Sequence, residues 1–330
     1  MGADPGFADR RVVITDCDHG DVAEERAVLD GADVDLRVAA CRTEDEVIRA
    51  GAGAAVLINQ YAPITATVLE ALPSLRLVVR YGVGVDNVDV DAATSCGVWV
   101  ANVPDYGTEE VADHTLALAL ALVRGVVRLD RSVRNGRWNY EDARPLRRLR
   151  TLTFGIVGCG AIGAAVAVRA RAFGMRVVGY DVRGERARAA GLEEVALEEL
   201  LRLADVVSVH ALLDDRSARL LGADAFAAMK PSAVLVNTAR GGLVDTDALL
   251  GALDRDEIAG AGLDVLDVEP PAASGARVAA HPRVVMTPHA AWYSEESFSA
   301  LKTEVAREAL RVLDGGSPRS PVNAPLELAS

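Results

Sequence analysis

A glycine-rich turn near the middle of the chain constrains the fold more than any other feature. It reads Gly158-Cys159-Gly160-Ala161-Ile162-Gly163, after a strand-like run at 153–157 and before a helix-like run at 161–173. A lone Gly-x-Gly-x-x-Gly pattern is weak evidence, because 29 glycines make chance matches common. Between a strand and a helix, however, Gly158 permits a tight turn, Gly160 admits a pyrophosphate and Gly163 allows close helix packing. The turn therefore predicts a βα unit that binds a dinucleotide.

Asp181 indicates which dinucleotide this unit binds. It ends the next strand-like run, 18 residues after Gly163. A carboxylate at this position accepts hydrogen bonds from the adenine ribose hydroxyls and repels a 2′-phosphate. Arg183 could attract such a phosphate, but we expect the nearer carboxylate to dominate. NAD is the predicted cofactor, and an α/β domain that binds no nucleotide is the alternative interpretation.

Two series of short apolar runs alternate with helix-like segments, which is typical of α/β domains with parallel sheets. A chain of 330 residues that is half apolar favours two domains. The first series has strand-like runs at 12–15, 34–38, 55–58 and 75–79. The second has six, at 154–157, 176–180, 206–210, 233–237, 260–265 and 284–287, which suits a dinucleotide-binding fold.

The segments between and after the two series have distinct compositions. A turn-rich stretch at 101–107 precedes a long helix-like run at 109–129, whose apolar residues on nearly every face predict a buried helix. The Arg-rich stretch at 135–150 is expected to be a solvated loop. A last helix is predicted at about 295–313, followed by an irregular, proline-containing tail.

Charge and cysteine content exclude several classes of partner. The formal charge of −13 repels nucleic acid. Cys17, Cys41, Cys96 and Cys159 lie far apart, which favours neither a zinc site nor a disulfide framework. The first ten residues lack the apolar core of a signal peptide, and the longest uncharged apolar stretch, 115–123, is too short to cross a bilayer. We expect a cytoplasmic protein without a nucleic-acid, membrane or metal partner.

Three residues that follow strand-like runs of the second series form a candidate catalytic group. Arg240, Glu269 and His289 each come just after such a run, and singly each could be an ordinary surface residue. The carboxyl ends of parallel strands meet at one edge of the sheet, where ligands gather. A guanidinium that binds carboxylates, a carboxylate and an imidazole are chemically complementary there. Together they predict an active site beside the cofactor.

These motifs resemble the D-isomer-specific 2-hydroxyacid dehydrogenase family over nearly the whole chain. The resemblance is carried by 80–89, 109–114, 158–163, 237–245, 264–269 and 287–290. The stretch 287–295 is most similar to the C-terminal binding protein branch, whose members are NAD-binding corepressors, and Arg80 also matches the phosphoglycerate dehydrogenase branch. One departure is His210-Ala211-Leu212-Leu213-Asp214, where the family usually has His-x-Pro-Leu-Thr.

The resemblance implies an architecture of two α/β domains. A Rossmann NAD-binding domain with a doubly wound parallel sheet would span 107–293. A flavodoxin-like substrate domain would combine 1–106 with 294–330, and the substrate would lie in a cleft between the domains. The apolar helix from Glu109 onward would form the interface of a homodimer.

The resemblance also implies hydride exchange between nicotinamide and C2 of a D-2-hydroxy or 2-oxo acid. His289 would be the general acid and base, paired with Glu269, and Arg240 would bind the substrate carboxylate and the 2-oxo oxygen. Val83 and Gly84 would offer backbone N–H groups to that carboxylate. The other substrate-binding candidates, which would shape the side-chain pocket, are Arg80, Tyr81 and Trp292. The cofactor-binding candidates are Gly158, Gly160, Ala161, Ile162, Gly163, Asp181, His210, Thr238, Asp264 and His289, with Asp264 expected to hold the nicotinamide amide.

Two other functions are compatible with the same motifs. One is an NADH-sensing, corepressor-like interaction protein without significant turnover, and the other is a phosphite-type dehydrogenase on the same fold. The sequence does not select the acid: Arg80 would suit a second anionic group, whereas Trp292 would suit an apolar or sulfur-bearing side chain.

Overall fold

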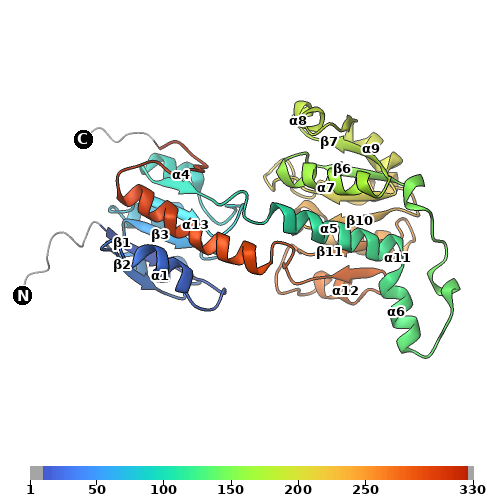
Figure 1. The fold of residues 1–330 in the computed structure, drawn as a ribbon, viewed down its shortest axis with the longest axis horizontal. Coiled ribbons are helices and arrows are strands. Elements are labelled where there is room, and N and C mark those ends of the chain that lie inside the picture. Colours follow the sequence, from blue (N-terminus) through green and yellow to red (C-terminus); the bar gives the residue numbers. More distant parts are fainter. Residues whose placement is uncertain (1–9, 326–330) are drawn as a thin grey trace, which may run out of the picture. The chain divides into compact units, whose positions relative to one another are not determined.

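The structure, a computed structural model, describes residues 10–325, which form two compact units (Figure 1). One unit contains the described residues up to Tyr106 and those from Ser294 onward, and the other is Gly107–Tyr293. The predicted absence of a signal segment at 1–10 falls almost entirely outside the described residues. Within 10–325, no helix is both long and apolar enough to span a membrane.

The first unit is built on a five-stranded parallel sheet. Its strands lie in the order β2-β1-β3-β4-β5, which is the order of the flavodoxin-like doubly wound fold. The central strand β3 is buried along its whole length, as its apolar run requires. The strand bounds are β1 Arg11–Ile14, β2 Asp35–Val38, β3 Val56–Asn59, β4 Leu77–Arg80 and β5 Trp99–Ala101.

Helices cover both faces of this sheet. Residues of α2, α3 and α4 share one apolar core with alternate strand residues. Helix α13 packs along α1 and also contacts β3 and β4, so the last long helix of the chain completes the unit formed by the first hundred residues (Figure 1). The helix bounds are α1 Ala23–Leu29, α2 Glu44–Gly51, α3 Ala66–Ala71, α4 Val90–Ser95 and α13 Glu295–Leu313.

The second unit contains a seven-stranded parallel sheet in the order β12-β11-β10-β9-β6-β7-β8. The chain starts at β6, runs outward to β8 and returns to the other side of β6 with β9, so the switch point lies between β6 and β9. This is the doubly wound order of dinucleotide-binding domains. The strand bounds are β6 Thr153–Val157, β7 Arg176–Tyr180, β8 Glu193–Glu194, β9 Val206–Val209, β10 Val234–Asn237, β11 Gly260–Leu263 and β12 Val284–Met286.

Two apolar cores lie on the two faces of this second sheet. Helices α5 and α7 contribute to one core, and α9 to α12 contribute to the other. Small strand residues allow close approach: a Cβ added at Gly262 would lie 3.0 Å from Cβ of Leu118 on α5. The helix bounds are α5 Thr108–Val123, α6 Val126–Arg134, α7 Ala161–Ala172, α8 Gly184–Ala189, α9 Leu197–Leu203, α10 Ala223–Ala228, α11 Thr246–Asp254 and α12 Ser274–Ala280.

The predicted fold class is confirmed, with three local corrections. The run expected as one helix at 109–129 is interrupted at Gly125, whose φ of +63° is left-handed, so α5 and α6 are separate helices. Strand β5 and the two-residue strand β8 were not predicted. The Arg-rich stretch is partly ordered, since it contains two short 3₁₀ helices at Tyr140–Ala143 and Leu149–Thr151, and Arg147 pairs with Asp205 at 2.8 Å.

Candidate active site

The three candidate catalytic residues follow three adjacent strands of the second unit. Arg240 comes after β10, Glu269 after β11 and His289 after β12, and these strands are neighbours in the sheet. Because all three strands are parallel, their carboxyl ends lie along one edge. The topology therefore brings together residues that are 29 and 20 positions apart in sequence.

His289 and Glu269 form a hydrogen-bonded pair. The imidazole Nδ1 lies 2.7 Å from Glu269 Oε2, and Oε1 of the same carboxylate accepts the Leu266 N–H at 2.8 Å. A carboxylate accepts only, so Nδ1 carries the proton in this pair and Nε2 is the nitrogen that can exchange one with a substrate. Partial burial acts to raise the pKa of Glu269, but the hydrogen bond and charge of His289 outweigh it, and the net pKa is lowered.

The backbone around Arg240 packs directly against the loop that carries Glu269. A Cβ added to Gly241 would lie 1.8 Å from the carbonyl carbon of Leu266, so only glycine allows this approach. The Arg240 carbonyl accepts a hydrogen bond from Asn237 Nδ2 at 2.9 Å, and its guanidinium donates to the Ala239 carbonyl at 2.8 Å. Its positive charge also acts to lower the pKa of Glu269, to a smaller extent than His289 does.

Asp264 holds the loop that presents His289. Its Oδ1 accepts bonds from the Thr287 hydroxyl at 2.5 Å and the Ala290 N–H at 2.9 Å, and its Oδ2 accepts the Ala291 N–H at 2.8 Å. Its carbonyl accepts the His289 N–H at 2.8 Å. His289 has a left-handed φ of +54°, which is unfavourable for a residue with a Cβ. We infer that the bonds to buried Asp264 stabilise this conformation.

A histidine on α5 extends this network. His114 Nε2 lies 2.9 Å from the Thr287 hydroxyl and 3.8 Å from Asp264 Oδ1. Because the hydroxyl donates to Asp264, it can accept from a His114 N–H at the same time. The network therefore connects the helix that begins this unit to the loop that carries the imidazole.

The glycine turn has the geometry that a bound dinucleotide needs. Gly158 has φ +94°, and an added Cβ there would lie 2.5 Å from the Ala211 backbone nitrogen. A Cβ at Gly163 would lie 2.2 Å from the Gly158 carbonyl oxygen, whereas nothing lies within 4 Å of one at Gly160. The first and third glycines are thus required for packing, and the second leaves open space at the N-terminus of α7. A pyrophosphate fits this arrangement.

The other predicted cofactor residues also lie near the carboxyl ends of strands or at the start of α7. Asp181 follows β7, and its carboxylate accepts the Cys159 N–H at 2.8 Å and the Arg183 N–H at 2.9 Å. His210 follows β9 and lies 2.7 Å from the Ser208 hydroxyl, and burial lowers its pKa to about 3, so the ring is neutral at pH 7. The Thr238 hydroxyl lies 2.8 Å from that of Thr115 on α5. Ala161 and Ile162 are the first two residues of α7.

The first unit carries the predicted carboxylate-binding loop. The Gly82 carbonyl accepts the Val103 N–H at 3.0 Å, and the Val83 carbonyl accepts Asn102 Nδ2 at 2.6 Å. In a trans peptide the N–H points opposite to the preceding carbonyl, so the N–H groups of Val83 and Gly84 both turn away from these partners. Neither donates to another residue within 10–325. Adjacent N–H groups of this kind form a concavity suited to an anion.

Comparisons with known proteins match residues of both units. Residues 116–291, more than half of the chain, match the model of the D-isomer-specific 2-hydroxyacid dehydrogenase NAD-binding domain. The chain belongs to this family. A glyoxylate reductase of Korarchaeum cryptofilum is 44% identical over 269 residues, covering 79% of this chain and 80% of the relative. A glycerate dehydrogenase of Methylorubrum extorquens is 37% identical over 289 residues, covering 86% and 90%.

Solved structures and longer relatives extend the comparison. A D-lactate dehydrogenase of Aquifex aeolicus, solved with NAD and lactic acid, has a TM-score of 0.85 and 29% identity over 96% of this chain and all of that one. A D-3-phosphoglycerate dehydrogenase of Bacillus subtilis is 38% identical over 273 residues, covering 82% of this chain but 51% of the relative. The chain thus spans about half the length of that relative, and most of the length of the glyoxylate reductase and the glycerate dehydrogenase.

As a D-2-hydroxyacid dehydrogenase, the protein is an NAD-dependent oxidoreductase that exchanges hydride with C2 of a 2-hydroxy or 2-oxo acid. Bound NADH would be held by the glycine turn, the α7 N-terminus and Asp181, and it would supply the hydride. Within 10–325, no group of three or more His, Cys, Asp or Glu side chains is arranged to hold a metal ion.

The structure places the remaining substrate candidates in both units. Arg80 ends β4 in the first unit, and Trp292 lies in the second unit with its ring edge-on to Tyr293 at 5.7 Å. Tyr81 directly follows Arg80; it is 2% exposed and its hydroxyl donates to Glu25. Sequence reasoning missed Thr287 and His114 as supports of the catalytic loop. Their only signal in the sequence was their position inside two of the stretches that carry the family resemblance, 109–114 for His114 and 287–290 for Thr287.

Proposed function

We propose that the protein reduces a small 2-oxo acid with NADH, using Arg240, Glu269 and His289. The observation that carries this proposal is the 2.7 Å pair of His289 and Glu269 on the sheet edge that also carries Arg240. The pair supplies a protonated imidazole whose orientation is fixed by the carboxylate. The arginine supplies the planar cation that recognises a carboxylate and a neighbouring oxygen.

Each residue has one task in the reductive direction. Arg240 binds the substrate carboxylate and stabilises negative charge on the 2-oxo oxygen as hydride reaches C2. His289 Nε2 gives its proton to that oxygen, which becomes the hydroxyl. Glu269 keeps the ring in place and stabilises its positive charge before the transfer. In the oxidative direction His289 takes the same proton back as a base.

The relatives favour a short substrate. A glyoxylate reductase and a glycerate dehydrogenase both match over most of their length, and the acids in these names carry at most a hydroxymethyl group beyond C2. We therefore propose glyoxylate and hydroxypyruvate as the first acids to test. Val83 and Gly84 would bind the carboxylate through their N–H groups, and Arg80 and Trp292 would shape the side-chain pocket.

A steady-state assay of NADH oxidation tests this proposal. The panel contains glyoxylate, hydroxypyruvate, pyruvate and 3-phosphohydroxypyruvate, with phosphite and NAD as a separate reaction. We expect turnover with glyoxylate or hydroxypyruvate, and its loss in His289→Gln with NADH binding retained. NADH binding without turnover on any acid would instead support a sensor, and turnover of phosphite alone would support the phosphite-type reaction.

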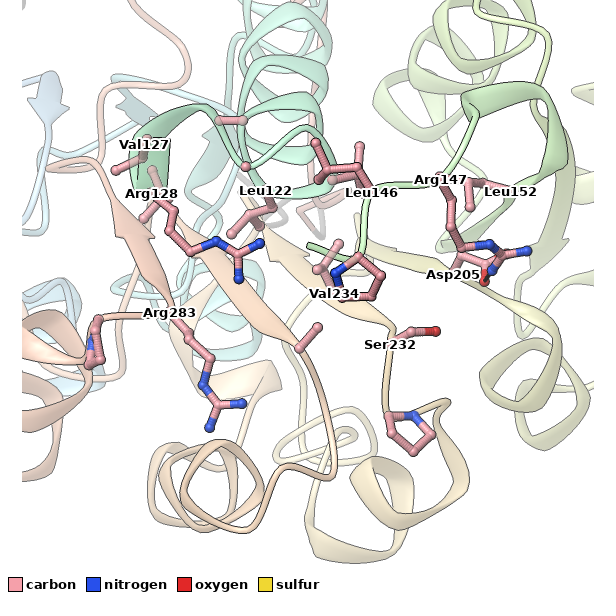
Figure 2. A pocket seen from close by; sticks show the side chains of 18 residues that line it. Leu122, Val127, Arg128, Leu146, Arg147, Leu152, Asp205, Ser232, Val234 and Arg283 are labelled. Atoms are coloured by element: carbon pink, nitrogen blue, oxygen red, sulfur yellow. Dashed lines mark hydrogen bonds and ion pairs between the residues drawn. The ribbon is translucent and has the colours of Figure 1, made fainter. Parts of the chain in front are cut away.

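We also propose that the protein is a homodimer that uses the region around α6. Four large apolar side chains are exposed in this region: Val126, Val133, Trp138 and Tyr140, with Trp138 90% exposed. Beside them lies a cavity of about 390 Å³ whose lining includes Leu122, Val127, Leu146 and Val234 (Figure 2). Exposed apolar surface of this kind marks an interface. A second copy of the chain is the proposed occupant.

Light scattering after size exclusion tests the dimer. We expect twice the chain mass of 34.7 kDa for the wild type and a shift toward one chain in Trp138→Ala with Tyr140→Ala. A wild type that elutes with the mass of one chain would contradict the proposal. We further propose a cytoplasmic location, for which the scattered cysteines without a Cys-x-x-Cys pair are the support, and we propose no nucleic-acid or membrane partner.

A further inference from the structure

A buried polar cluster in the first unit has no role in the chemistry described above. Tyr81 directly follows β4, and its hydroxyl donates to Glu25 Oε1 at 2.6 Å. Glu25 lies on α1 and is fully buried. The other carboxylate oxygen, Oε2, lies 3.6 Å from Lys302 Nζ on α13. Two helices from opposite ends of the chain therefore meet at Glu25, which also accepts the hydrogen bond from the tyrosine beside the 82–84 loop.

Glu25 and Lys302 are closed to solvent, and Lys302 is the cation shared by two neighbouring carboxylates, Glu24 and Glu25. Lys302 is 1% exposed, and its ammonium also lies 2.7 Å from Glu24 Oε2 and donates to the Asp21 carbonyl at 2.7 Å. It stands 4.9 Å from the centre of the Phe298 ring. A buried carboxylate is retained only where a cation and hydrogen bonds compensate it. Lys302 and the Tyr81 hydroxyl provide these to Glu25.

The Tyr81 hydroxyl remains a donor under ordinary conditions. Burial raises the pKa of Tyr81, and the negative charge of Glu25 raises it further. Burial also raises the pKa of Glu25, while the hydrogen bond from Tyr81 acts in the opposite direction. The contact therefore joins a protonated phenol to an acceptor that is buried away from solvent.

Tyr81 lies at the start of the loop that offers N–H groups to the substrate carboxylate. Its own N–H continues the sheet by donating to the Asn59 carbonyl at 2.8 Å. The Gly82 and Val83 carbonyls are held by Val103 and Asn102 on the far side of the loop. The loop is thus anchored on the β4 side through Tyr81 and, at the Gly82 and Val83 carbonyls, through Val103 and Asn102.

We propose that Glu25, supported by Lys302, is a positioning residue that fixes the 82–84 loop through the Tyr81 hydroxyl. This inference rests on the proposed function, because it assigns the Val83 and Gly84 N–H groups to the substrate carboxylate. Glu25 and Lys302 touch no substrate. They set the direction of two N–H groups that do, and so determine how tightly a 2-oxo acid is bound rather than how fast hydride moves.

The test variant is Tyr81→Phe, which keeps the ring and removes only the hydroxyl. Carboxylate binding contributes equally before and during hydride transfer, so its loss raises KM and leaves kcat nearly unchanged. We expect KM for glyoxylate to rise about tenfold, the size of one lost hydrogen bond to a charged group. NADH affinity, measured by fluorescence titration, should stay the same.

Two further variants separate positioning from stability. Glu25→Gln keeps an acceptor oxygen for the Tyr81 hydroxyl, and we expect a smaller rise in KM than in Tyr81→Phe. Asp35→Asn is the matched control, since it breaks a partly buried pair with Arg11 (2.8 Å) in the same unit but away from the loop. It should lower the melting temperature without changing KM. An equal KM increase in this control would overturn the proposal.

Hydrogen exchange gives a readout that needs no turnover. In Tyr81→Phe, amides of the segment 82–86 should exchange faster than in the wild type, and in Asp35→Asn they should not. Faster exchange in a protein that turns over no 2-oxo acid would refute the proposed function and keep the positioning role. Unchanged exchange together with unchanged KM would refute the positioning role in an active enzyme.

Discussion

Replacing Glu269 by glutamine tests the contribution of the charge beside His289. The amide keeps the size and one acceptor oxygen of the side chain, so the 2.7 Å contact can persist while the negative charge is lost. Reduction requires the protonated imidazole as the acid. Without the carboxylate the positive charge of the ring is less stabilised, so kcat/KM for reduction should fall.

The size of this effect follows from the geometry. At roughly 4 Å, two unit charges attract each other by about 1 kcal/mol in bulk water and by about 4 kcal/mol near a protein surface. The His289 and Glu269 side chains are 33% and 36% exposed, which places the pair toward the lower value. With about 1.4 kcal/mol for each factor of ten in rate, kcat/KM for reduction should fall by about fivefold to tenfold.

The assay is kcat/KM for glyoxylate reduction between pH 5 and pH 10 in buffers of constant ionic strength. Glu257→Gln is the matched control, because Glu257 forms an exposed pair with Arg255 in the same unit. A kcat/KM for reduction that is unchanged or higher in Glu269→Gln would refute the reasoning.

Loss of folding stability does not account for this expected fall in kcat/KM. The folded-state pKa of Glu269 is lowered, so the pair stabilises the fold above the ordinary carboxyl pKa and loses this effect as the pH falls through the folded value. A pair that is one third exposed contributes at most about 1 kcal/mol. The two proteins should therefore have similar stability at neutral pH and converge in acid, as urea unfolding would show.

Three further perturbations test other parts of the site. Arg240→Lys should lower kcat/KM by roughly 100-fold, because an ammonium cannot reproduce the planar fork, and near wild-type rates would contradict its role. Asp264→Asn should lower kcat and reduce the unfolding free energy by about 1–3 kcal/mol, since a charged acceptor of three hydrogen bonds is lost. Unchanged urea unfolding would contradict the supporting role of Asp264. Gly163→Ala should destabilise the fold, because its Cβ would meet the Gly158 carbonyl. Gly160→Ala should fold normally, because nothing lies near its Cβ, and it should lose NADH binding in a fluorescence titration. Tight NADH binding by Gly160→Ala would contradict the assignment of this turn to the pyrophosphate.

The periodic spacing of apolar residues was enough to predict most of the fold. Apolar runs of four or five residues between helix-like segments marked β6, β7, β9 and β10 to within a residue, because buried parallel strands need continuous apolar sequence. Strand β8 escaped prediction because its two residues are exposed glutamates. The break between α5 and α6 escaped because the apolar pattern continues through Gly125, and only its left-handed φ separates the helices.

The candidate site was predictable where a residue's place follows from the topology alone. Arg240, Glu269 and His289 each follow a strand by a few residues, and the order of parallel strands is sufficient to bring strand ends together. The contact of His289 Nδ1 with Glu269 Oε2 could not be predicted in this way, because it depends on the left-handed backbone at His289. No sequence pattern indicates that conformation, since left-handed residues are usually glycine or asparagine.

The supporting residues that sequence reasoning missed depend on contacts across long sequence separations. Tyr81 is predicted as a substrate-binding residue because it follows Arg80 in a family motif, and the structure adds that its hydroxyl donates to Glu25, 56 positions earlier. Lys302 meets the same carboxylate from the other end of the chain. A pattern can place a residue at a strand end, but it cannot show which way the side chain turns when a buried charge elsewhere needs a donor. Chemistry at a strand end is therefore readable from sequence, whereas the supports that hold it, Asp264 behind His289 and Glu25 behind Tyr81, emerge only when the chain is folded.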